Sequence, residues 1–408
     1  MRSRIAAPRP AAAKRAKKIR GFNSKVQRNF SMGKKAFDLN QSAAKSQPMS
    51  IAGRNAKGLD RKTKWELLSP FLRQYGNSSM AYSTLQEGLE YFVDERDGYA
   101  AFSTITHPFL SRSGRQMVLG NPICAEEHYG RFLDSLLSVH KNPVFLQVSD
   151  SFQKVLLERG YYATRMGVET ELPIQTYSLS GRRKQNIRTS RNQALKQGIT
   201  VEEFDLGNTS DTLEDISKEW ISGRILNSRE IWYFARRLVT EKEEDVRGFL
   251  ARNKQGGPLG FIIFDPMYFN NSIHGYAANI ARFKEGFKQG VNDTVILAAL
   301  EKFKEEGRSK LNLGLSPLRN VGDETRPREN RSSKLAFRFL YSHGNFVYNF
   351  RNLGFHKSRY AGDEKPVYFC SRDSIQIRDI YLAMKNAGLL MSGTELFKKL
   401  LNNIIHPQ

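Results

Sequence analysis

The sequence has few cysteines and no long hydrophobic run. Two cysteines among 408 residues, Cys124 and Cys370, have neither the spacing of a metal site nor the density of a disulfide-stabilised fold, which favours a reducing compartment. No apolar run approaches the roughly 18 residues that a membrane-spanning helix needs. The first residues also lack the continuous apolar core of a signal peptide. We therefore expect a cytoplasmic protein that is soluble or peripheral to a membrane.

Signatures of covalent and metal-dependent catalysis are also missing. The chain has no G-x-S-x-G nucleophile elbow, and neither cysteine has a sequence setting that marks a reactive thiolate. None of the seven histidines has an H-x-x-x-H or Cys-His spacing that would predict a metal site. We therefore expect no metal ion and no cofactor.

Acidic residues are scarce in the first 64 positions. The whole chain has 64 Lys and Arg against 41 Asp and Glu, a net charge of +23, and residues 1–64 contain 18 basic and 2 acidic side chains. This tail is poor in periodic apolar residues, which predicts disorder. Its charge would attract an anionic membrane or RNA, and charge alone does not choose between them. A solubilising tail or an organellar transit peptide are the alternatives.

The remaining residues, within a chain of 39% hydrophobic content, are enough for two domains. Alternating apolar runs at 98–102 and 143–148, with a helical pattern at 129–140 between them, predict an α/β domain over residues 65–179. A composition break at Ser180-Gly181 predicts a second domain over 180–390. Residues 391–408 have the pattern of an amphipathic helix, which would pack on the second domain or dock shallowly on a membrane.

The most informative stretch is residues 274–318. Residues 291–306 have helical periodicity, with Asn292 or Asp293 as a possible N-cap, and short apolar strands are predicted at 274–280 and 310–315. This order of strand, glycine-containing loop, helix and strand can bring Arg282, Asp293 and Asn312 to one site.

A basic helix is predicted at the start of the second domain, over residues 182–197. It has six positive residues and no acidic one, although surface helices usually mix the two signs. The alternative to a phosphate contact is a solvated charged face, and nothing in the pattern predicts base recognition or DNA binding. The candidates for contact with tRNA or another phosphate are Arg182, Arg183, Lys184, Arg188 and Arg191.

Short motifs in a fixed order extend from about residue 75 to 370. They are Gly120-Asn121-Pro122-Ile123, Gly167-Val168-Glu169, Ser180-Gly181-Arg182-Arg183, Arg282-Phe283, Gly290-Val291-Asn292-Asp293, Asn312 to Leu318, Tyr348-Asn349-Phe350, Phe355 to Tyr360 and Pro366-Val367-Tyr368. In this order and spacing the chain resembles the C-terminal catalytic domain of the phosphatidylglycerol lysyltransferases, also called aminoacyl-phosphatidylglycerol synthases.

The resemblance implies a fold and an activity. The fold would be a tandem pair of GNAT-like α/β acyltransferase domains, with mixed sheets flanked by helices. The activity would move an amino acid, for which lysine is one candidate, from aminoacyl-tRNA to a hydroxyl of phosphatidylglycerol or a related anionic lipid. Familiar members also carry a membrane-spanning flippase region, and we expect a form without it, peripheral on the inner face of the membrane.

Three residues are candidates for catalytic roles, and the resemblance favours function over the structural alternatives for Asp293 and Arg282. Asp293 would bind the α-ammonium or a cationic side chain of the amino acid, with helix capping as the alternative role. Arg282 would hold the aminoacyl ester or a phosphate, unless it is a surface arginine at a strand end. Lys357 would stabilise a phosphate or the developing oxyanion. A solvated basic pair with Arg359 is the alternative.

Four further residues are predicted to bind substrate. Asn312 and Ser316 flank Gly314 and could orient a carbonyl, although a turn would also explain them. Arg359 alternates with Lys357 in an apparent strand, so both would project to one face. Tyr348 could line an acceptor channel or belong to the core.

Two other functions remain open at this stage. A coenzyme-A-dependent N-acyltransferase would need a glycine-rich pyrophosphate loop, and the spacing from Arg282 through Gly286 to Gly290 does not match one. A non-catalytic RNA- or membrane-binding protein would be compatible with the basic tail alone.

Overall fold

The structure is a computed structural model that describes residues 59–222, 232–284, 286, 288–322, 328–343 and 350–390, with the backbone of 49–51. All of these residues lie in one compact unit, which spans 48–408. The predicted helix over 391–408, Tyr348 and nearly all of the basic tail lie outside the described residues.

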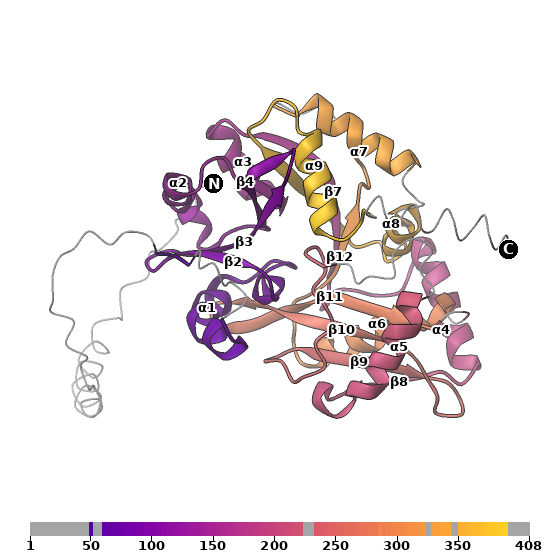
Figure 1. The fold of residues 1–408 in the computed structure, drawn as a ribbon. Helices are drawn as coiled ribbons and strands as arrows, with labels where there is room; N and C mark the ends of the chain where they lie inside the picture. Colours follow the sequence, from indigo (N-terminus) through magenta and orange to yellow (C-terminus); the bar gives the residue numbers. More distant parts are fainter. Residues whose placement is uncertain are drawn as a thin grey trace, which may run out of the picture. The chain divides into compact units, whose positions relative to one another are not determined.

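One sheet of 13 strands runs through the described part of the chain (Figure 1). Its order is β1-β2-β3-β4-β6-β13-β7-β12-β11-β10-β9-β8, and β5 pairs with β3. Strands β4 and β6, like β11 and β12, are parallel, and the other neighbours are antiparallel. The strands are β1 (Met49–Ile51), β2 (Glu90–Asp94), β3 (Gly98–His107), β4 (Ser111–Leu119), β5 (Ile123–Cys124), β6 (Val144–Val148), β7 (Tyr162–Pro173), β8 (Thr200–Phe204), β9 (Arg247–Arg252), β10 (Pro258–Phe269), β11 (Ser272–Phe283), β12 (Lys310–Pro317) and β13 (Asp363–Ser371).

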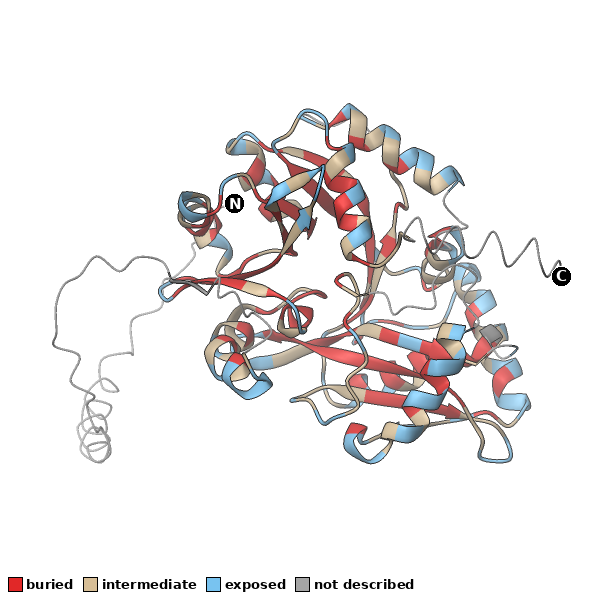
Figure 2. Ribbon diagram, in the orientation of Figure 1, coloured by how far each residue is buried: buried red, intermediate tan, exposed pale blue. Residues whose placement is uncertain are grey.

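Helices cover this sheet and leave their outer faces exposed (Figure 2). Their apolar residues recur at helical spacing, as in α2, where Phe132, Leu133 and Leu136 are fully buried. The α-helices are α1 (Arg61–Tyr75), α2 (Tyr129–Val139), α3 (Asp150–Glu158), α4 (Gln185–Lys196), α5 (Ser210–Ser222), α6 (Lys288–Glu305), α7 (Arg331–His343), α8 (Phe350–Ser358) and α9 (Ile377–Asn386).

The two halves of the sheet are joined by strands that are distant in sequence. Strand β13 comes late in the chain but lies between β6 and β7. Strand β7 in turn pairs with β12, where Val168 opposes Ser316 and Gly167 opposes Pro317. The sequence boundary near residue 180 therefore does not separate two sheets.

Strands β11 and β12 pair over only three positions, from Gly275–Lys310 to Ala277–Asn312. Beyond Asn312 the register of β12 against β7 shifts before it resumes at Leu315. Gly314, in this shift, has φ +78°, a conformation that favours glycine. The interruption leaves the second half of each strand free to border a cavity.

Helix α6 packs closely on α4 because of a glycine. Gly290 has φ +85°, and a Cβ there would lie 2.7 Å from the carbonyl oxygen of Ser190. The inner face of α6 buries Val295, Ala299 and Phe303 completely against the sheet. Burial of a valine or phenylalanine side chain stabilises the fold by about 1.5–3 kcal/mol.

Two local predictions are wrong. Helix α6 begins at Lys288, so neither Asn292 nor Asp293 is its N-cap. The segment with Lys357 is the helix α8 and not a strand, and Arg359 follows its end. The strand was predicted because Lys357 and Arg359 stand at alternate positions, but this spacing is also compatible with the end of a helix. In the described part of the chain, no helix combines the length and hydrophobicity needed to cross a bilayer.

Candidate functional site

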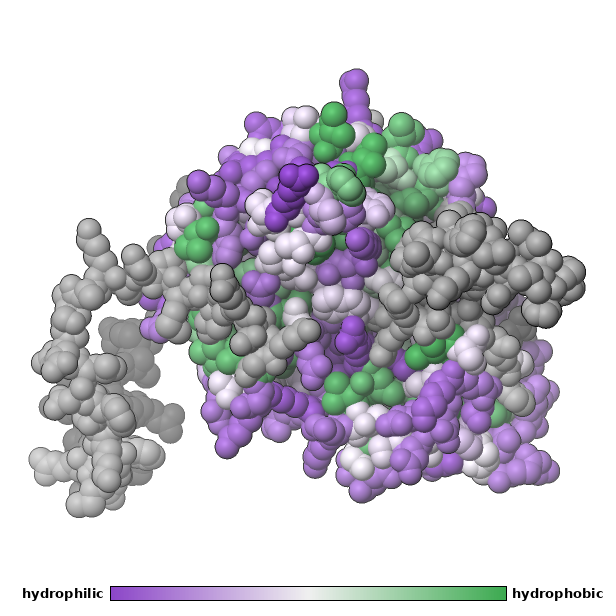
Figure 3. All heavy atoms as spheres, in the orientation of Figure 1, coloured by the Kyte–Doolittle hydropathy of each residue, from purple (hydrophilic) through white to green (hydrophobic). Residues whose placement is uncertain are grey.

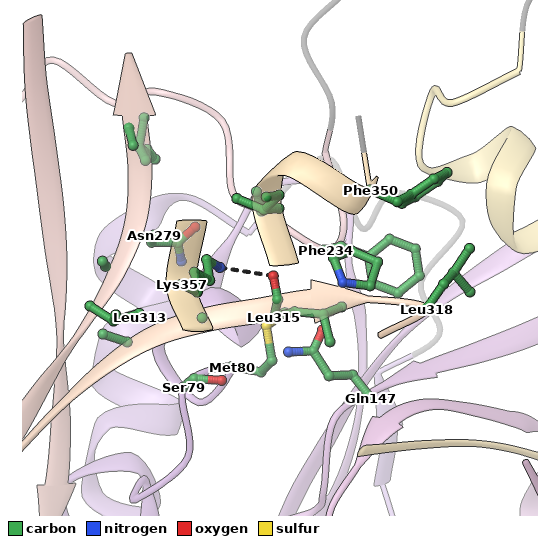
Figure 4. Close-up of a pocket in the computed structure, with 18 of the residues that line it drawn as sticks. Ser79, Met80, Gln147, Phe234, Asn279, Leu313, Leu315, Leu318, Phe350 and Lys357 are labelled. Carbon is green, nitrogen blue, oxygen red and sulfur yellow. Dashed lines mark hydrogen bonds between the residues drawn. The ribbon is translucent and has the colours of Figure 1, made fainter. Parts of the chain in front are cut away.

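A cavity of about 710 Å³ lies where β11 and β12 stop pairing. Its walls come from these strands and α6, from the β6 and β7 side, and from α7, α8 and α9. Most of the lining is hydrophobic, including Met80, Met166, Phe234, Leu313, Leu315 and Phe337. An apolar cavity with a few polar groups is typical of a small-molecule site. Figure 4 shows Lys357, Asn279, Gln147 and Ser79 among the apolar side chains.

Lys357 brings an amino group to the wall of this cavity. Its Nζ donates a hydrogen bond to the carbonyl oxygen of Leu315 at 2.8 Å (Figure 4). Because Gly314 has no side chain, space remains beside Nζ, only 3.5 Å from where a Cβ would stand. Burial lowers the pKa of Lys357 to about 7, against the opposite effect of the Glu169 carboxylate. Near neutral pH, this amine can therefore accept or donate a proton.

The carboxylate of Glu169 is held by two side-chain amides. Gln147 donates to Oε1 at 2.8 Å, and Asn312 donates to Oε2 at 2.9 Å. Asn312 also accepts a hydrogen bond from the backbone N–H of Gly314 at 2.7 Å. Asn312 therefore fixes both the bend of β12 and the carboxylate that acts on Lys357.

Asp293 is the centre of a second buried cluster. Its carboxylate is 1% exposed and accepts hydrogen bonds from Tyr360 Oη at 2.7 Å and Arg359 Nη2 at 3.2 Å. Burial lowers the pKa of His356 to about 4, so its ring is neutral at neutral pH. His356 and Asn292, with their side-chain nitrogens 3.3 Å apart, line the cavity. The cluster ties α6 to the end of α8, next to Lys357.

A third polar group lies on β10, β11 and the segment after residue 232. Arg236 borders the cavity and is paired with the fully buried Asp265, with Nε to Oδ1 at 2.8 Å. Asn279 also borders the cavity and donates to Asp265 at 2.5 Å and to Ser83 at 2.7 Å. Arg282 lines the same wall, with its guanidinium 5.3 Å from the ring centroid of Trp220.

The structure distributes the predicted site residues over different positions. Lys357 and Arg282 line the cavity directly. Asp293, Arg359 and Asn312 are not part of its lining and hold neighbouring groups in place. Ser316 is fully buried, and its hydroxyl has no hydrogen-bond partner among the described residues.

The predicted basic helix corresponds to a short 3₁₀ turn, Arg182–Lys184, and α4. Two of its cations bind the preceding loop, since Lys184 donates to the carbonyl of Ser178 at 2.7 Å and Arg188 to that of Gly181 at 2.8 Å. Arg191 pairs with Glu301 of α6 at 3.0 Å. The side chains of Arg182 and Arg183 are exposed.

Several residues of the site had no assigned role in the sequence analysis. Glu169 belongs to a motif quoted there, and its place in a buried apolar strand was the available signal. Gln147, Asn279 and Arg236 lie in apolar or loop segments with no motif, so only the fold brings them to the cavity. No cluster of three or more potential metal ligands occurs within the described ranges.

Comparison with known proteins identifies the family of the chain. Residues 69–371 match the profile of the family "Phosphatidylglycerol lysyltransferase, C-terminal". The chain is 23% identical over 330 residues to the phosphatidylglycerol lysyltransferase of Bacillus subtilis (strain 168), covering 78% of this chain and 36% of that protein. It is 22% identical over 320 residues to the enzyme of Staphylococcus aureus (strain COL), covering 76% and 36%. The chain thus spans about a third of these relatives.

Two solved structures have a similar fold. The structure of L-PGS from Bacillus licheniformis matches with a TM-score of 0.62 at 19% identity, covering 79% of this chain and 96% of that one. The C-terminal domain of a putative lysylphosphatidylglycerol synthetase from Agrobacterium fabrum matches with a TM-score of 0.63 at 18% identity, covering 82% and 98%. The predicted mixed α/β fold, a mixed sheet flanked by helices, is confirmed. Because the profile match covers most of the chain, this protein belongs to the family of the phosphatidylglycerol lysyltransferase C-terminal domain.

Proposed function

We propose that this protein transfers an amino acid from aminoacyl-tRNA to a hydroxyl group of phosphatidylglycerol or a related anionic lipid, at a membrane surface on its cytoplasmic side. The family membership supports the reaction class. The observation that carries the proposal is the apolar cavity with Lys357 at its wall, whose pKa is lowered to about 7 by burial. A partly neutral lysine inside an apolar cavity is suited to proton transfer between two oxygens.

The apolar lining of the cavity suits the glyceride part of a lipid acceptor. Hydrophobic side chains of α7 and α9, such as Phe337 and Met384, make up part of the cavity wall. The polar wall, with Arg282 and Asn279, would then receive the aminoacyl ester. In this arrangement the attacking hydroxyl and the ester carbonyl meet near Lys357.

The reaction needs one bond to form and one to break. The lipid hydroxyl oxygen attacks the carbonyl carbon of the aminoacyl ester, and its proton passes to neutral Lys357. The bond between the carbonyl carbon and the tRNA ribose oxygen then breaks, and the ammonium of Lys357 returns the proton to that oxygen. Arg282 is positioned on the cavity wall to stabilise the negative charge that develops on the carbonyl oxygen. No covalent enzyme intermediate is required, because the ester is already activated.

The residues around Lys357 have positioning roles in this scheme. Asp293 binds Arg359 and Tyr360 and so fixes the end of α8, on which Lys357 lies. The carboxylate of Glu169 accepts a hydrogen bond from Asn312, and its negative charge keeps the pKa of Lys357 from falling further. We assign no direct substrate contact to Ser316. Arg182 and Arg183 are the exposed cations of the basic helix and the strongest candidates for contact with the tRNA backbone.

The test is a transfer assay with the full chain, radiolabelled aminoacyl-tRNA and vesicles that contain phosphatidylglycerol. We expect label in the lipid phase as an alkali-labile ester, formed without coenzyme A. Lys357→Met is expected to reduce the rate by at least about 100-fold, whereas Lys365→Met, a change of an exposed lysine on β13, leaves it unchanged.

Two outcomes would overturn the proposal. Absence of labelled lipid with every aminoacyl-tRNA, together with RNA or vesicle binding, would favour the non-catalytic alternative. Formation of product only with an acyl-coenzyme A would favour the N-acyltransferase. Comparing lysyl-tRNA with the other charged tRNAs identifies the amino acid.

A further inference from the structure

Three neighbouring segments expose large hydrophobic side chains. They are the tip of the β3–β4 hairpin with Phe109 (85% exposed), the outer side of α7 with Leu335 (71%) and Phe339 (62%), and the start of α9 with Ile375 (71%) and Ile377 (55%). We call these five residues, with Tyr381, the apolar face. Figure 3 shows hydrophobic residues gathered over α7 and beside α9, in the upper part of the view.

Contacts between the segments place them side by side. The ring of His107, at the base of the hairpin tip, lies 6.0 Å from the ring of Tyr381 on α9. Helix α7 is joined to the residue before α9 by a hydrogen bond from Ser333 Oγ to Gln376 Oε1 at 2.6 Å. The start of α9 therefore contacts α7, and α9 itself contacts the hairpin tip, so the three segments are neighbours.

The hairpin tip is ordered in a way that holds its phenylalanine outward. Nδ1 of His107 accepts hydrogen bonds from the backbone N–H groups of Phe109 at 3.3 Å and Leu110 at 3.2 Å. These bonds close the turn with the side chain of Phe109 in solvent. A fixed, exposed phenylalanine gains free energy when an apolar phase covers it.

The fully exposed charges in the described segments around the apolar face are positive. Arg112 on the hairpin, Arg331 and Arg338 on α7, and Lys385 on α9 are exposed. Within segments 107–115, 328–343 and 372–390, all of which are described, no acidic residue is exposed, and Asp373 and Asp379 are bound by Arg115 and Arg378. An apolar centre with a basic rim matches the surface of an anionic bilayer.

The inner faces of the same two helices line the cavity. Phe337 and Leu340 of α7, and Ile380 and Met384 of α9, contribute to its wall. A surface that touches the outer faces of α7 and α9 is therefore separated from the cavity by a single layer of helix.

We propose that the apolar face is a docking surface for an anionic lipid bilayer, into which Phe109, Phe339 and Ile377 insert shallowly. This inference rests on the proposed function only in taking the bilayer as the source of the acceptor lipid. Docking at the apolar face brings α7 and α9, whose inner sides line the cavity, into contact with the bilayer. A lipid then has to cross only this layer of helices to reach Lys357.

Sedimentation of the full chain with vesicles of phosphatidylglycerol and phosphatidylcholine tests the proposal. The triple variant Phe109→Ser, Phe339→Ser, Ile377→Ser is expected to lower partition onto the mixed vesicles at least roughly tenfold. The matched control is Leu195→Ser with Phe269→Ser, which removes two exposed apolar residues elsewhere. It should change partition less than about twofold. Equal partition of wild type and triple variant, or an equal loss in the control, would overturn the proposal.

A fluorescent label locates the contact directly. The two native cysteines are buried, and burial raises the pKa of both thiols, so an introduced cysteine would be labelled selectively. With an environment-sensitive dye, Phe109→Cys is expected to show a blue shift on anionic vesicles, and Phe269→Cys no shift. If the dye at position 109 were already blue-shifted without lipid and lost that shift on deletion of residues 391–408, the chain's own C-terminal segment would be the occupant and the proposal would be wrong.

Transfer to short-chain phosphatidylglycerol, dissolved as monomers, separates this inference from the proposed function. The triple variant should keep wild-type transfer to the monomeric lipid and lose transfer to lipid in vesicles. If wild type transferred to neither, the proposed function would fail, and vesicle partition would still decide the docking surface.

Discussion

Replacing Lys357 by methionine is expected to stabilise the protein near neutral pH, although it reduces the rate of transfer by at least about 100-fold. Burial lowers the pKa of this lysine from 10.5 to about 7, which means that the folded protein disfavours the ammonium form. A methionine of similar length keeps the packing with the apolar lining and removes the group that must be desolvated.

The size of the effect follows from the pKa difference. About 3.5 pH units at 1.36 kcal/mol each give a cost of roughly 5 kcal/mol for the native lysine. Lys357 is only partly buried by surface area, and solvent screens a partly exposed charge, so we take about half of this value. The substitution also removes the hydrogen bond to the carbonyl of Leu315, worth about 1 kcal/mol. The expected net gain is about 1.5 kcal/mol at pH 7.

The lowered pKa of Lys357 also determines how the stability difference between wild type and Lys357→Met changes with pH. Above pH 10.5 the lysine is neutral in both the folded and the unfolded protein, so it contributes no difference in protonation. As the pH falls from 10.5 towards 7, the unfolded state binds a proton that the folded state does not, and the folded protein loses stability. The advantage of Lys357→Met is therefore largest at pH 7 and below, and it shrinks towards pH 10.

Urea unfolding of wild type and Lys357→Met at several pH values between 6 and 10 measures this difference, with Lys365→Met as the control. A difference in unfolding free energy that does not change with pH would refute a lowered pKa at Lys357. If Lys357→Met were less stable than wild type at every pH, the ammonium group would stabilise the folded protein. The hypothesis that Lys357 transfers a proton would then be rejected.

Three further changes follow from the structure. Asp293→Asn is expected to lower the unfolding free energy by about 3 kcal/mol, because it breaks the buried ion pair with Arg359. Chemical denaturation measures this loss, and a loss under about 1 kcal/mol would contradict the role of Asp293 in a buried ion pair. Since burial lowers the pKa of His356 to about 4, wild type should lose stability as the pH falls from 6.5 to 4, when only the unfolded ring gains a proton. His356→Gln should lose less over that range, and parallel curves would refute this. Gly290→Ala is expected to lower the unfolding free energy by more than about 2 kcal/mol, because its Cβ would clash with the Ser190 carbonyl oxygen. Gly286 also has a positive φ but has open space around it, so Gly286→Ala should lower the unfolding free energy by only about 1 kcal/mol. Equal melting temperatures of the two variants would contradict the packing argument.

The sequence alone was sufficient for the protein family and for the local elements of the central segment. The periodicity of residues 291–306 predicted α6, and the flanking apolar runs predicted β11 and β12, because an amphipathic pattern depends only on which residues must face the core. Motif order then predicted the family, which the profile match confirms.

The tertiary structure decided which residues face the cavity. The chain order gives no sign that β13 inserts between β6 and β7, since strand pairing depends on contacts far apart in sequence. In the sequence, Asp293 and Lys357 were equally good candidates for a catalytic residue. In the folded protein the carboxylate of Asp293 is buried against Tyr360, whereas the amine of Lys357 reaches the cavity. A pKa near 7 for Lys357 follows from desolvation, which is a property of the assembled surroundings and of no single segment.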